Sequence, residues 1–410
     1  MGRGTFRSQN KVGETMSFQT DSSSATTFDP TVTFLSGSDR VSWDLGDGSG
    51  YVADSSLSYS YDDTGTTKTV TLRTNKLSNL YGVLFNFDNL VGDLDFSGWD
   101  NMGGSFNATS NPKLTGITHT TSTEGFYYYN AQSCNLIGNH DMSMFPNLGG
   151  TFLLGSNSEL TGVTHTASTQ VFSNYQIQTC NLIGNHDVSM FPNLGGDFRL
   201  QNNSELTGVT HTASTQLFTV YYANSCNLTG NHDVSMFPNL GGNFRIYSNS
   251  ALTGITHTAS TQTFSNYWVN NCNLIGNHDV SMFPNLGGVF FVYSNPLLTS
   301  ITHPVSTQTF SLYRAYSCNL DYVDFLPLSG ASITGDIQLQ DNSMSVTDVN
   351  HILVDFDNIS TNLNPSGWTG TTLNISGTNA APDSSSGGFD GIAALSSLTG
   401  GTNNWTITTS

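Results

Sequence analysis

The sequence predicts a mainly β protein whose chain winds as a solenoid of short strands. Its five cysteines, at positions 134, 180, 226, 272 and 318, are each 46 residues apart, and a fixed period of this kind is typical of repeat architectures. An asparagine stands 23 residues before each cysteine, at positions 111, 157, 203, 249 and 295. The chain of 410 residues contains 41 glycines and only 10% charged residues. That composition favours turn-rich β structure over helices.

The residues before each Asn or Cys predict a strand. An aromatic residue stands five positions before, and a smaller, mostly apolar residue three positions before. Inward residues two apart indicate a strand, because strand side chains alternate between faces. The aromatic residues are Phe106, Tyr129, Phe152, Tyr175, Phe198, Tyr221, Phe244, Tyr267, Phe290 and Tyr313. The smaller residues are Ala108, Ala131, Leu154, Ile177, Leu200, Ala223, Ile246, Val269, Val292 and Ala315.

The Asn and Cys positions form a ladder with a structural task. A buried Asn side chain can bond to backbone groups left unpaired where the chain turns out of the strand. Consecutive cysteines lie two coils apart, or about 10 Å, whereas a disulfide needs Cα atoms within about 7 Å. We therefore expect buried, free thiols and no metal site at the cysteines.

The pattern aromatic-x-aliphatic-x-x-[Asn/Cys] over residues 78–344 resembles the leucine-rich repeat. The resemblance implies a leucine-rich-repeat solenoid of 23-residue coils arranged in 46-residue double repeats. The convex segments show no helical pattern, so the far side is expected to be extended or irregular. The sequence LGG that precedes many strands supplies freedom for a turn.

The N-terminal part carries the turn Trp43–Gly48 within VSWDLGDGSG, then Tyr61, Gly65 and a strand at 69–72. This motif resembles a polycystic-kidney-disease-type (PKD) β-sandwich. The resemblance implies a β-sandwich-like domain over residues 15–77, preceded by an arm of residues 1–14. Modules of that family are mostly spacers and adhesive units. We interpret the aspartates of the turn as turn formers rather than calcium ligands.

Residues 345–410 are predicted to form a small α/β C-terminal cap, which a solenoid needs because its end exposes the core. A last strand is expected at 336–339. Ser345 is the expected N-cap of a helix, and a short helix and a final strand at 405–408 follow. One face of the first helix carries Val349, Ile352, Leu353 and Phe356.

Variation among the repeats concentrates at strand positions that point away from the core. The turns NHDVSMFPNLGG and LTG-[VI]-THTAST recur almost unchanged. The variable positions are rich in Tyr, Trp, Arg and Asn, which dominate binding hot spots. We weigh binding above neutral drift, because drift would also have changed exposed turns. The predicted ligand-binding face comprises Asn130, Gln176, Arg199, Gln201, Tyr222, Asn224, Arg245, Tyr247, Trp268, Asn270, Phe291, Tyr293, Arg314 and Tyr316.

Two columns of histidines accompany the turns: His119, His165, His211, His257 and His303, and His140, His186, His232 and His278. Within a column the spacing is about 10 Å, too wide for one zinc ion with Zn–N bonds of about 2 Å. Neighbouring coils could bring one histidine of each column within about 5 Å. A metal-binding or pH-sensitive ladder is therefore an alternative, but we interpret these histidines as solvated turn residues.

Several function classes are disfavoured. A net charge of −19 argues against nucleic-acid binding, which requires cations to neutralise phosphates. The sequence contains no run of 18 apolar residues, so no membrane-spanning segment is predicted. The N-terminus lacks the apolar segment of a signal peptide. No nucleophile elbow, phosphate loop or metalloprotease motif is present, and no cofactor is expected. A polysaccharide depolymerase would need paired acids, which the variable face almost lacks.

The C-terminal ending, the aromatic repeats and the missing export signal together resemble phage tail or virion-fibre proteins that carry leucine-rich repeats. The resemblance implies a non-enzymatic virion protein, made in the host cytoplasm, which contacts other head or tail proteins and a host-surface glycan or protein receptor. One alternative is a bacterial cell-surface adhesin whose signal peptide was removed. Another is a purely architectural decoration protein. Assembly as a homo-oligomer stays open.

Overall fold

In the computed structural model the chain is mainly β, with a β-solenoid of about 11 coils of about 23 residues each and few helices. The predicted solenoid class and coil length are thereby confirmed. The structure describes residues 14–22, 27–35, 40–61, 66–77, 80–85 and 88–410. It divides into two compact units, Met1–Asn181 and Leu182–Ser410, which are described in turn. None of the helices among the described residues is long and apolar enough to cross a membrane.

The N-terminal strands of the first unit share sheets with its first coils. The strand order of one sheet is β11-β9-β1-β7-β4-β5, and β1 runs antiparallel to both β7 and β9. In a second sheet, β3 pairs antiparallel with β8, and β2 and β6 form a separate two-stranded antiparallel sheet. The strands are β1 (Glu14–Asp21), β2 (Thr27–Phe28), β3 (Thr31–Phe34), β4 (Val41–Asp44), β5 (Tyr51–Val52), β6 (Tyr59–Ser60), β7 (Thr67–Thr74), β8 (Leu80–Leu84), β9 (Leu90–Phe96) and β11 (Lys113–His119). Backbone hydrogen bonds therefore join residues 14–77 to the coils that follow.

The aspartates of the N-terminal turn act as the sequence predicts. The Oδ1 atom of Asp44 accepts from the Gly46 N–H at 3.1 Å, and that of Asp47 accepts from the Ser49 N–H at 2.8 Å. Trp43 is fully buried and donates from Nε1 to the carbonyl of Asp54 at 2.7 Å. The predicted Gly65 and arm residues 1–13 lie outside the described residues. The sandwich boundary at residue 77 stays a prediction.

In the remaining coils of the first unit, parallel strands extend the sheet in the order β8-β10-β12-β14-β16. These are β10 (Gly104–Asn107), β12 (Phe126–Asn130), β14 (Gly150–Leu153) and β16 (Phe172–Gln176). On the far side, β13 (Gly138–Met142) pairs parallel with β15 (Leu160–His165).

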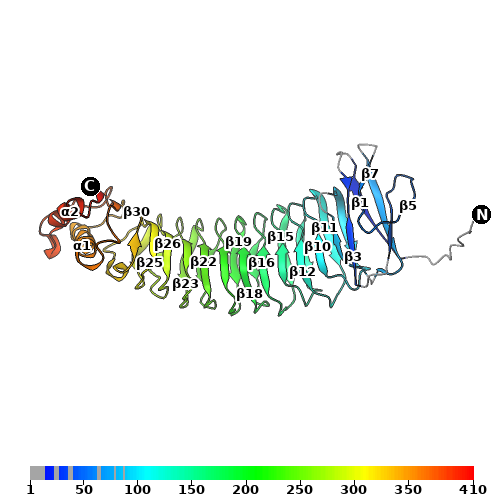
Figure 1. Cartoon of the computed structure of the whole chain (residues 1–410), viewed down its shortest axis with the longest axis horizontal. Coiled ribbons are helices and arrows are strands. Elements are labelled where there is room, and N and C mark those ends of the chain that lie inside the picture. The colour runs from blue at the N-terminus through cyan, green and yellow to red at the C-terminus, as the bar shows by residue number, and fades with distance from the viewer. Residues whose placement is uncertain (1–13, 23–26, 36–39, 62–65, 78–79, 86–87) are drawn as a thin grey trace, which may run out of the picture. The chain divides into compact units, whose positions relative to one another are not determined.

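The second unit repeats this arrangement, and its strands stand side by side in Figure 1. The sheet order is β18-β20-β22-β24-β26-β28-β30-β31-β32, with β29 also beside β28. The strands are β18 (Leu194–Arg199), β20 (Phe218–Tyr222), β22 (Leu240–Arg245), β24 (Phe264–Trp268), β26 (Leu286–Phe291), β28 (Thr309–Arg314), β29 (Ser332–Ile333), β30 (Asp336–Gln338), β31 (Thr372–Asn374) and β32 (Thr406–Thr408).

The far side of the second unit is extended, which is one of the two alternatives that the sequence predicts. It consists of parallel strand pairs rather than irregular chain. The pairs are β17 (Gly184–Asp187) with β19 (Leu206–Thr210), β21 (Thr229–Asp233) with β23 (Ala251–Thr256), and β25 (Ile275–Asp279) with β27 (Leu297–Thr302). Each pair joins segments about one coil apart, so the local sequence pattern alone does not reveal it.

The strand register stacks the predicted aromatic residues into a core column. Tyr221 pairs with Phe244, and Phe244 pairs with Tyr267. Their ring centroids are 5.5 Å and 5.3 Å apart, and all three side chains are fully buried. The predicted strand phase is therefore confirmed, and burial of these rings supplies much of the apolar core.

The Asn ladder bonds to the backbone as predicted. The Asn249 amide nitrogen donates to the carbonyls of Ala223 at 2.9 Å and Ile246 at 2.6 Å, while its oxygen accepts from the Leu228 N–H at 3.1 Å. The preceding residue, Ser248, has a left-handed φ of 56° and donates its N–H to the Asn270 carbonyl at 3.0 Å. The cysteines are free, as predicted, and all are buried except the half-buried Cys226.

The predicted cap is present. Helix α1 (Val346–Asn358) starts at Ser345, whose side chain forms a capping box with Asp348, and continues as a π-helical turn over Ile359–Leu363. Helix α2 (Gly391–Thr399) follows, and 3-10 turns lie at Leu326–Leu328 and Ser386–Gly388. Phe356 packs against Phe325 at 4.7 Å and Trp405 at 5.3 Å between centroids. These rings close the end of the core, beside which Figure 1 draws α1 and α2.

The recurrent turns are not exposed loops. Within NHDVSMFPNLGG, the Phe residues at positions 145, 191, 237 and 283 are fully buried. In the related turn, Ser214 is also buried and donates to the Leu194 carbonyl at 2.7 Å. The constancy of these turns therefore follows from packing. The constant turns are therefore no evidence that the variation on the strand face reflects ligand binding rather than neutral drift.

Candidate functional site: the cation–aromatic column

The register of the second unit brings six outward side chains into one column, one from each successive strand. Each pairs directly with the next across neighbouring strands. In order from β18 to β28 the cation–aromatic column comprises Arg199, Tyr222, Arg245, Trp268, Phe291 and Arg314. All six were predicted as part of the binding face.

Guanidinium groups and aromatic rings are neighbours along this column, which also contains one pair of adjacent rings, Trp268 and Phe291. The guanidinium carbon of Arg245 lies 4.8 Å from the ring centroid of Tyr222 and 3.9 Å from that of Trp268. The Trp268 and Phe291 rings stack at 5.3 Å with an angle of 22° between their planes. Arg199 lies 5.0 Å from the Tyr222 centroid, and Arg314 lies 4.9 Å from that of Phe291. Strand spacing of about 4.8 Å suits stacked planar groups.

A second predicted column runs beside the first and differs in exposure along its length. It comprises Gln201, Asn224, Tyr247, Asn270, Tyr293 and Tyr316. Tyr293 and Tyr316 stack with centroids 4.5 Å apart, and Tyr247 contacts Trp268 at 5.8 Å. Asn224 and Asn270 are buried between their neighbours. The exposed polar surface of this column is therefore mainly that of its tyrosines and Gln201.

Polar atoms of the face lack protein partners. Among the described residues, Arg245 Nε, Arg314 Nε, Trp268 Nε1 and Asn270 Oδ1 are buried without a hydrogen-bond partner. Arg199 differs, because its Nη2 atom forms an ion pair with Asp197 at 3.0 Å. A ligand cannot reach these buried atoms, so the hydrogen-bonding sites left for it on Arg245 and Arg314 are the outer guanidinium nitrogens, which are not among the buried atoms.

The arginines are unusual in this part of the chain. Arg199, Arg245 and Arg314 are the only Lys or Arg residues after Lys113, whereas acidic residues recur throughout the same stretch. Every Lys or Arg side chain of the second unit therefore belongs to the cation–aromatic column. The sequence displays this clustering, but it becomes apparent only once the strand register is known.

The two predicted face residues of the first unit are tied to their neighbours. The Asn130 oxygen accepts from the Gln132 N–H at 3.0 Å, and its amide nitrogen donates to the Tyr128 hydroxyl at 3.0 Å. Gln176 donates to Asn174 at 3.4 Å.

Sequence reasoning also missed an outward column on the other side of the core aromatics, to which Asp197 belongs. Its period-two spacing from Arg199 is the signal that would have found it.

The interpretation of the histidines as solvated turn residues was wrong. The Tyr221 hydroxyl lies 2.7 Å from the Nε2 atoms of both His211 and His232, inside the solenoid. Burial lowers the pKa of His232 to about 4 and holds that of His211 well below its usual range. The same bridge recurs at Tyr129 and Tyr267, with His119 and His140, and His257 and His278.

Each bridge has a preferred proton arrangement. The buried Nδ1 atom of His211 has no partner among the described residues, and a bare lone pair costs less there than an unsatisfied N–H. His211 therefore carries its proton on Nε2 and donates to the Tyr221 hydroxyl, which in turn donates to His232 Nε2.

In the described part of the chain, no group of three or more His, Cys, Asp or Glu side chains could hold a metal ion.

The cap contains a polar cluster that the sequence did not reveal. The His351 ring is stacked between Tyr322 and Phe389, with centroids 3.9 Å from each. Tyr322 donates its hydroxyl to Asp355, and His351 Nε2 lies 3.9 Å from the same carboxyl group. Burial, followed by the Asp355 carboxylate, raises the pKa of Tyr322. The cluster ties α1 to the last coil and contains no evident nucleophile.

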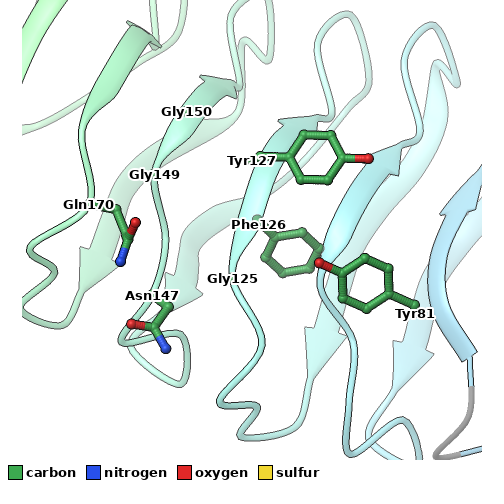
Figure 2. Close-up of a pocket in the computed structure, with 8 residues that line it drawn as sticks. All are labelled: Tyr81, Gly125, Phe126, Tyr127, Asn147, Gly149, Gly150 and Gln170. Atoms are coloured by element: carbon green, nitrogen blue, oxygen red, sulfur yellow. The ribbon is translucent and has the colours of Figure 1, made fainter. Parts of the chain in front are cut away.

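Figure 2 shows a shallow pocket in the first unit, lined by Tyr81, Tyr127, Asn147 and Gln170 above a floor of glycine backbone. Gly150 has a φ of 63°, and a Cβ atom there would lie 2.2 Å from the Tyr127 carbonyl oxygen, so the floor requires glycine. Burial, followed by Glu124, raises the pKa of Tyr81. The lining offers hydrogen bonds but no charged group.

Comparisons with protein-family models, with curated proteins and with solved structures found no match to this chain.

Proposed function

We propose that this chain is a non-enzymatic recognition protein of a phage virion, which binds a host-surface glycan or receptor through the cation–aromatic column. The observation that carries the proposal is the position of the Arg245 guanidinium group between Tyr222 and Trp268, where its outer nitrogens have no partner among the described residues. Trp, Tyr and Arg are the residue types that dominate binding hot spots. Rings fixed by stacking lose little entropy when a ligand binds.

We further propose that the solenoid is of the leucine-rich-repeat type and that residues 15–77 form a PKD-like base. The Asn ladder supports the first assignment, because each Asn bonds to the backbone where the chain leaves the strand. Trp43 and the Asp44–Ser49 turn support the second. In this proposal the base contacts other virion proteins and the column faces the host.

Mass spectrometry of purified virions tests the virion assignment. The proposal expects peptides of this chain in particles after density-gradient purification. Their presence in the envelope fraction of uninfected bacteria, and absence from particles, would instead identify the runner-up, a bacterial surface adhesin. A chain that is present in virions but whose column variants attach normally to cells would be an architectural decoration protein.

A further inference from the structure

We propose that the ligand of the cation–aromatic column is an acidic polysaccharide, whose carboxylates bind Arg245 and Arg314. The inference rests on the proposed recognition function and goes further by naming the ligand class. It depends on how the two guanidinium groups are held, where the basic charge lies, and how far apart the charges are.

The stacking of Arg245 restricts how it can bind a ligand. The ring centroids of Tyr222 and Trp268 lie 4.8 Å and 3.9 Å from its guanidinium carbon, so the group is held between two rings. Its remaining interaction sites are the N–H donors in the plane, which match the two oxygens of a carboxylate. The side chains of Arg245 and Arg314 form no hydrogen bond or ion pair with any described residue, so both cations are held by their ring neighbours and lack a counter-ion.

Charge complementarity identifies the sign of the ligand. The column holds every Lys and Arg residue after Lys113 in a chain of net charge −19. An anionic group is therefore attracted at the column and repelled elsewhere on the second unit. Of the three arginines, Arg199 is already neutralised by Asp197 at 3.0 Å. Arg245 and Arg314 are the two sites left for ligand charge.

The spacing favours a sparsely charged polymer. Arg245 and Arg314 lie three strands apart, or about 14 Å at about 4.8 Å per strand. A single small anion cannot bridge them, whereas carboxylates on separate sugars of one chain can. Duplex nucleic acid carries a charge about every 1.7 Å along its axis and would bring most of its phosphates against acidic surface. The hydroxyl groups of Tyr247, Tyr293 and Tyr316 lie beside the column over the stretch from Arg245 to Arg314, and they suit sugar hydroxyls.

Binding to purified polymers tests the inference. Polygalacturonate, alginate and hyaluronate are compared with their carboxyl-reduced, neutral derivatives, and with polyglutamate and duplex DNA, at low salt. We expect at least one acidic polysaccharide to bind, and its reduced form not to. Arg245→Gln and Arg314→Gln should each weaken binding by about tenfold or more. The charge-matched control Arg73→Gln, in the first unit, should bind like the unmodified chain, and unchanged melting temperatures would show that all variants fold.

Four results would overturn the inference: no acidic polysaccharide binds, the neutral forms bind equally well, both Arg variants bind normally, or DNA or polyglutamate binds more tightly than every acidic polysaccharide. Attachment to host cells separates this failure from failure of the recognition function. If Trp268→Ala abolishes attachment and Arg245→Gln does not, recognition stands and the acidic ligand is wrong. If neither variant changes attachment, recognition through the column is itself wrong.

Discussion

The Arg245 guanidinium group lies over the Trp268 indole of the next coil, with 3.9 Å between the guanidinium carbon and the ring centroid. The parallel register creates this contact, because it sets residues 23 positions apart side by side. The same register places Tyr221 beside Phe244 in the core. One repeat length therefore fixes both the buried column that stabilises the solenoid and the outward column proposed to bind.

Removing a tyrosine hydroxyl in the core should lower stability, whereas removing one on the strand face should not. Tyr221→Phe removes the hydroxyl that bridges His211 and His232 and leaves buried imidazole groups without a partner. We expect the free energy of unfolding to fall by about 1–3 kcal/mol. Tyr222→Phe, one residue along but half-exposed, should change it by less than about 0.5 kcal/mol. Urea denaturation measures both, and equal effects would contradict the assignment of the bridge.

Stability should fall steeply in mild acid. Burial lowers the pKa of His140, His186, His232, His278 and His303 to about 4, against about 6.5 in an unfolded chain. Between these values the unfolded state binds more protons, so stability is full above pH 6.5 and is lost as pH falls towards 4. The unfolding free energy measured from pH 7.5 to 4.5 should show this slope.

A variant identifies the source of that slope. His232→Gln removes one titrating group, so its unfolding free energy should depend less steeply on pH than that of the unmodified chain, whatever its stability at pH 7. A substitution at His351, which lies outside the solenoid bridges and is partly exposed, serves as the comparison. Identical slopes for His232→Gln and the unmodified chain would mean that the bridge histidines are not buried as neutral groups.

Asp88→Asn should stabilise the chain at neutral pH. Asp88 stands 23 residues before Asn111, in the ladder position, and is buried with its Oδ2 atom unpartnered among the described residues. Burial raises its pKa to about 8, so its contribution to stability is full below pH 3.8 and is lost as pH rises towards 8. The amide should raise the unfolding free energy by about 1–3 kcal/mol at pH 8. At pH 4 the gain in unfolding free energy should shrink. A gain independent of pH would contradict the raised pKa of the buried Asp88 carboxyl group.

The cysteines should react only after unfolding. Burial raises the pKa of Cys134, Cys180 and Cys226 to about 11 and that of Cys272 and Cys318 to about 12, so the reactive thiolate is scarce. Thiol titration in denaturant should find all five cysteines, and titration of the native chain at pH 7 close to none. Loss of thiols without added oxidant would reveal a disulfide and contradict the solenoid register.

The strand phase and the cap were predictable because they depend on local spacing. Phe198, Leu200 and Asn203 repeat every 23 residues, and Ser345 followed by Asp348 marks a helix start within four residues. The histidines were misjudged because their motifs, rich in Asn, Asp and Thr, have the composition of a turn. Their burial depends on the hydroxyl of a tyrosine such as Tyr221, whose contact with them the strand pattern does not indicate. The unpartnered donors of Arg245 and Trp268 likewise depend on contacts between coils.

Attachment to host cells, compared between variants in the cation–aromatic column and a variant on the far side of the solenoid, tests the central proposal most directly. Trp268→Ala and Tyr222→Ala remove outward rings, and Asp233→Asn changes an exposed residue at the end of β21, on the far side. If the cation–aromatic column is the recognition surface, each ring variant should lose about 2 kcal/mol or more of binding free energy, with an unchanged melting temperature. Asp233→Asn should attach like the unmodified chain. Normal attachment of both ring variants would contradict the account.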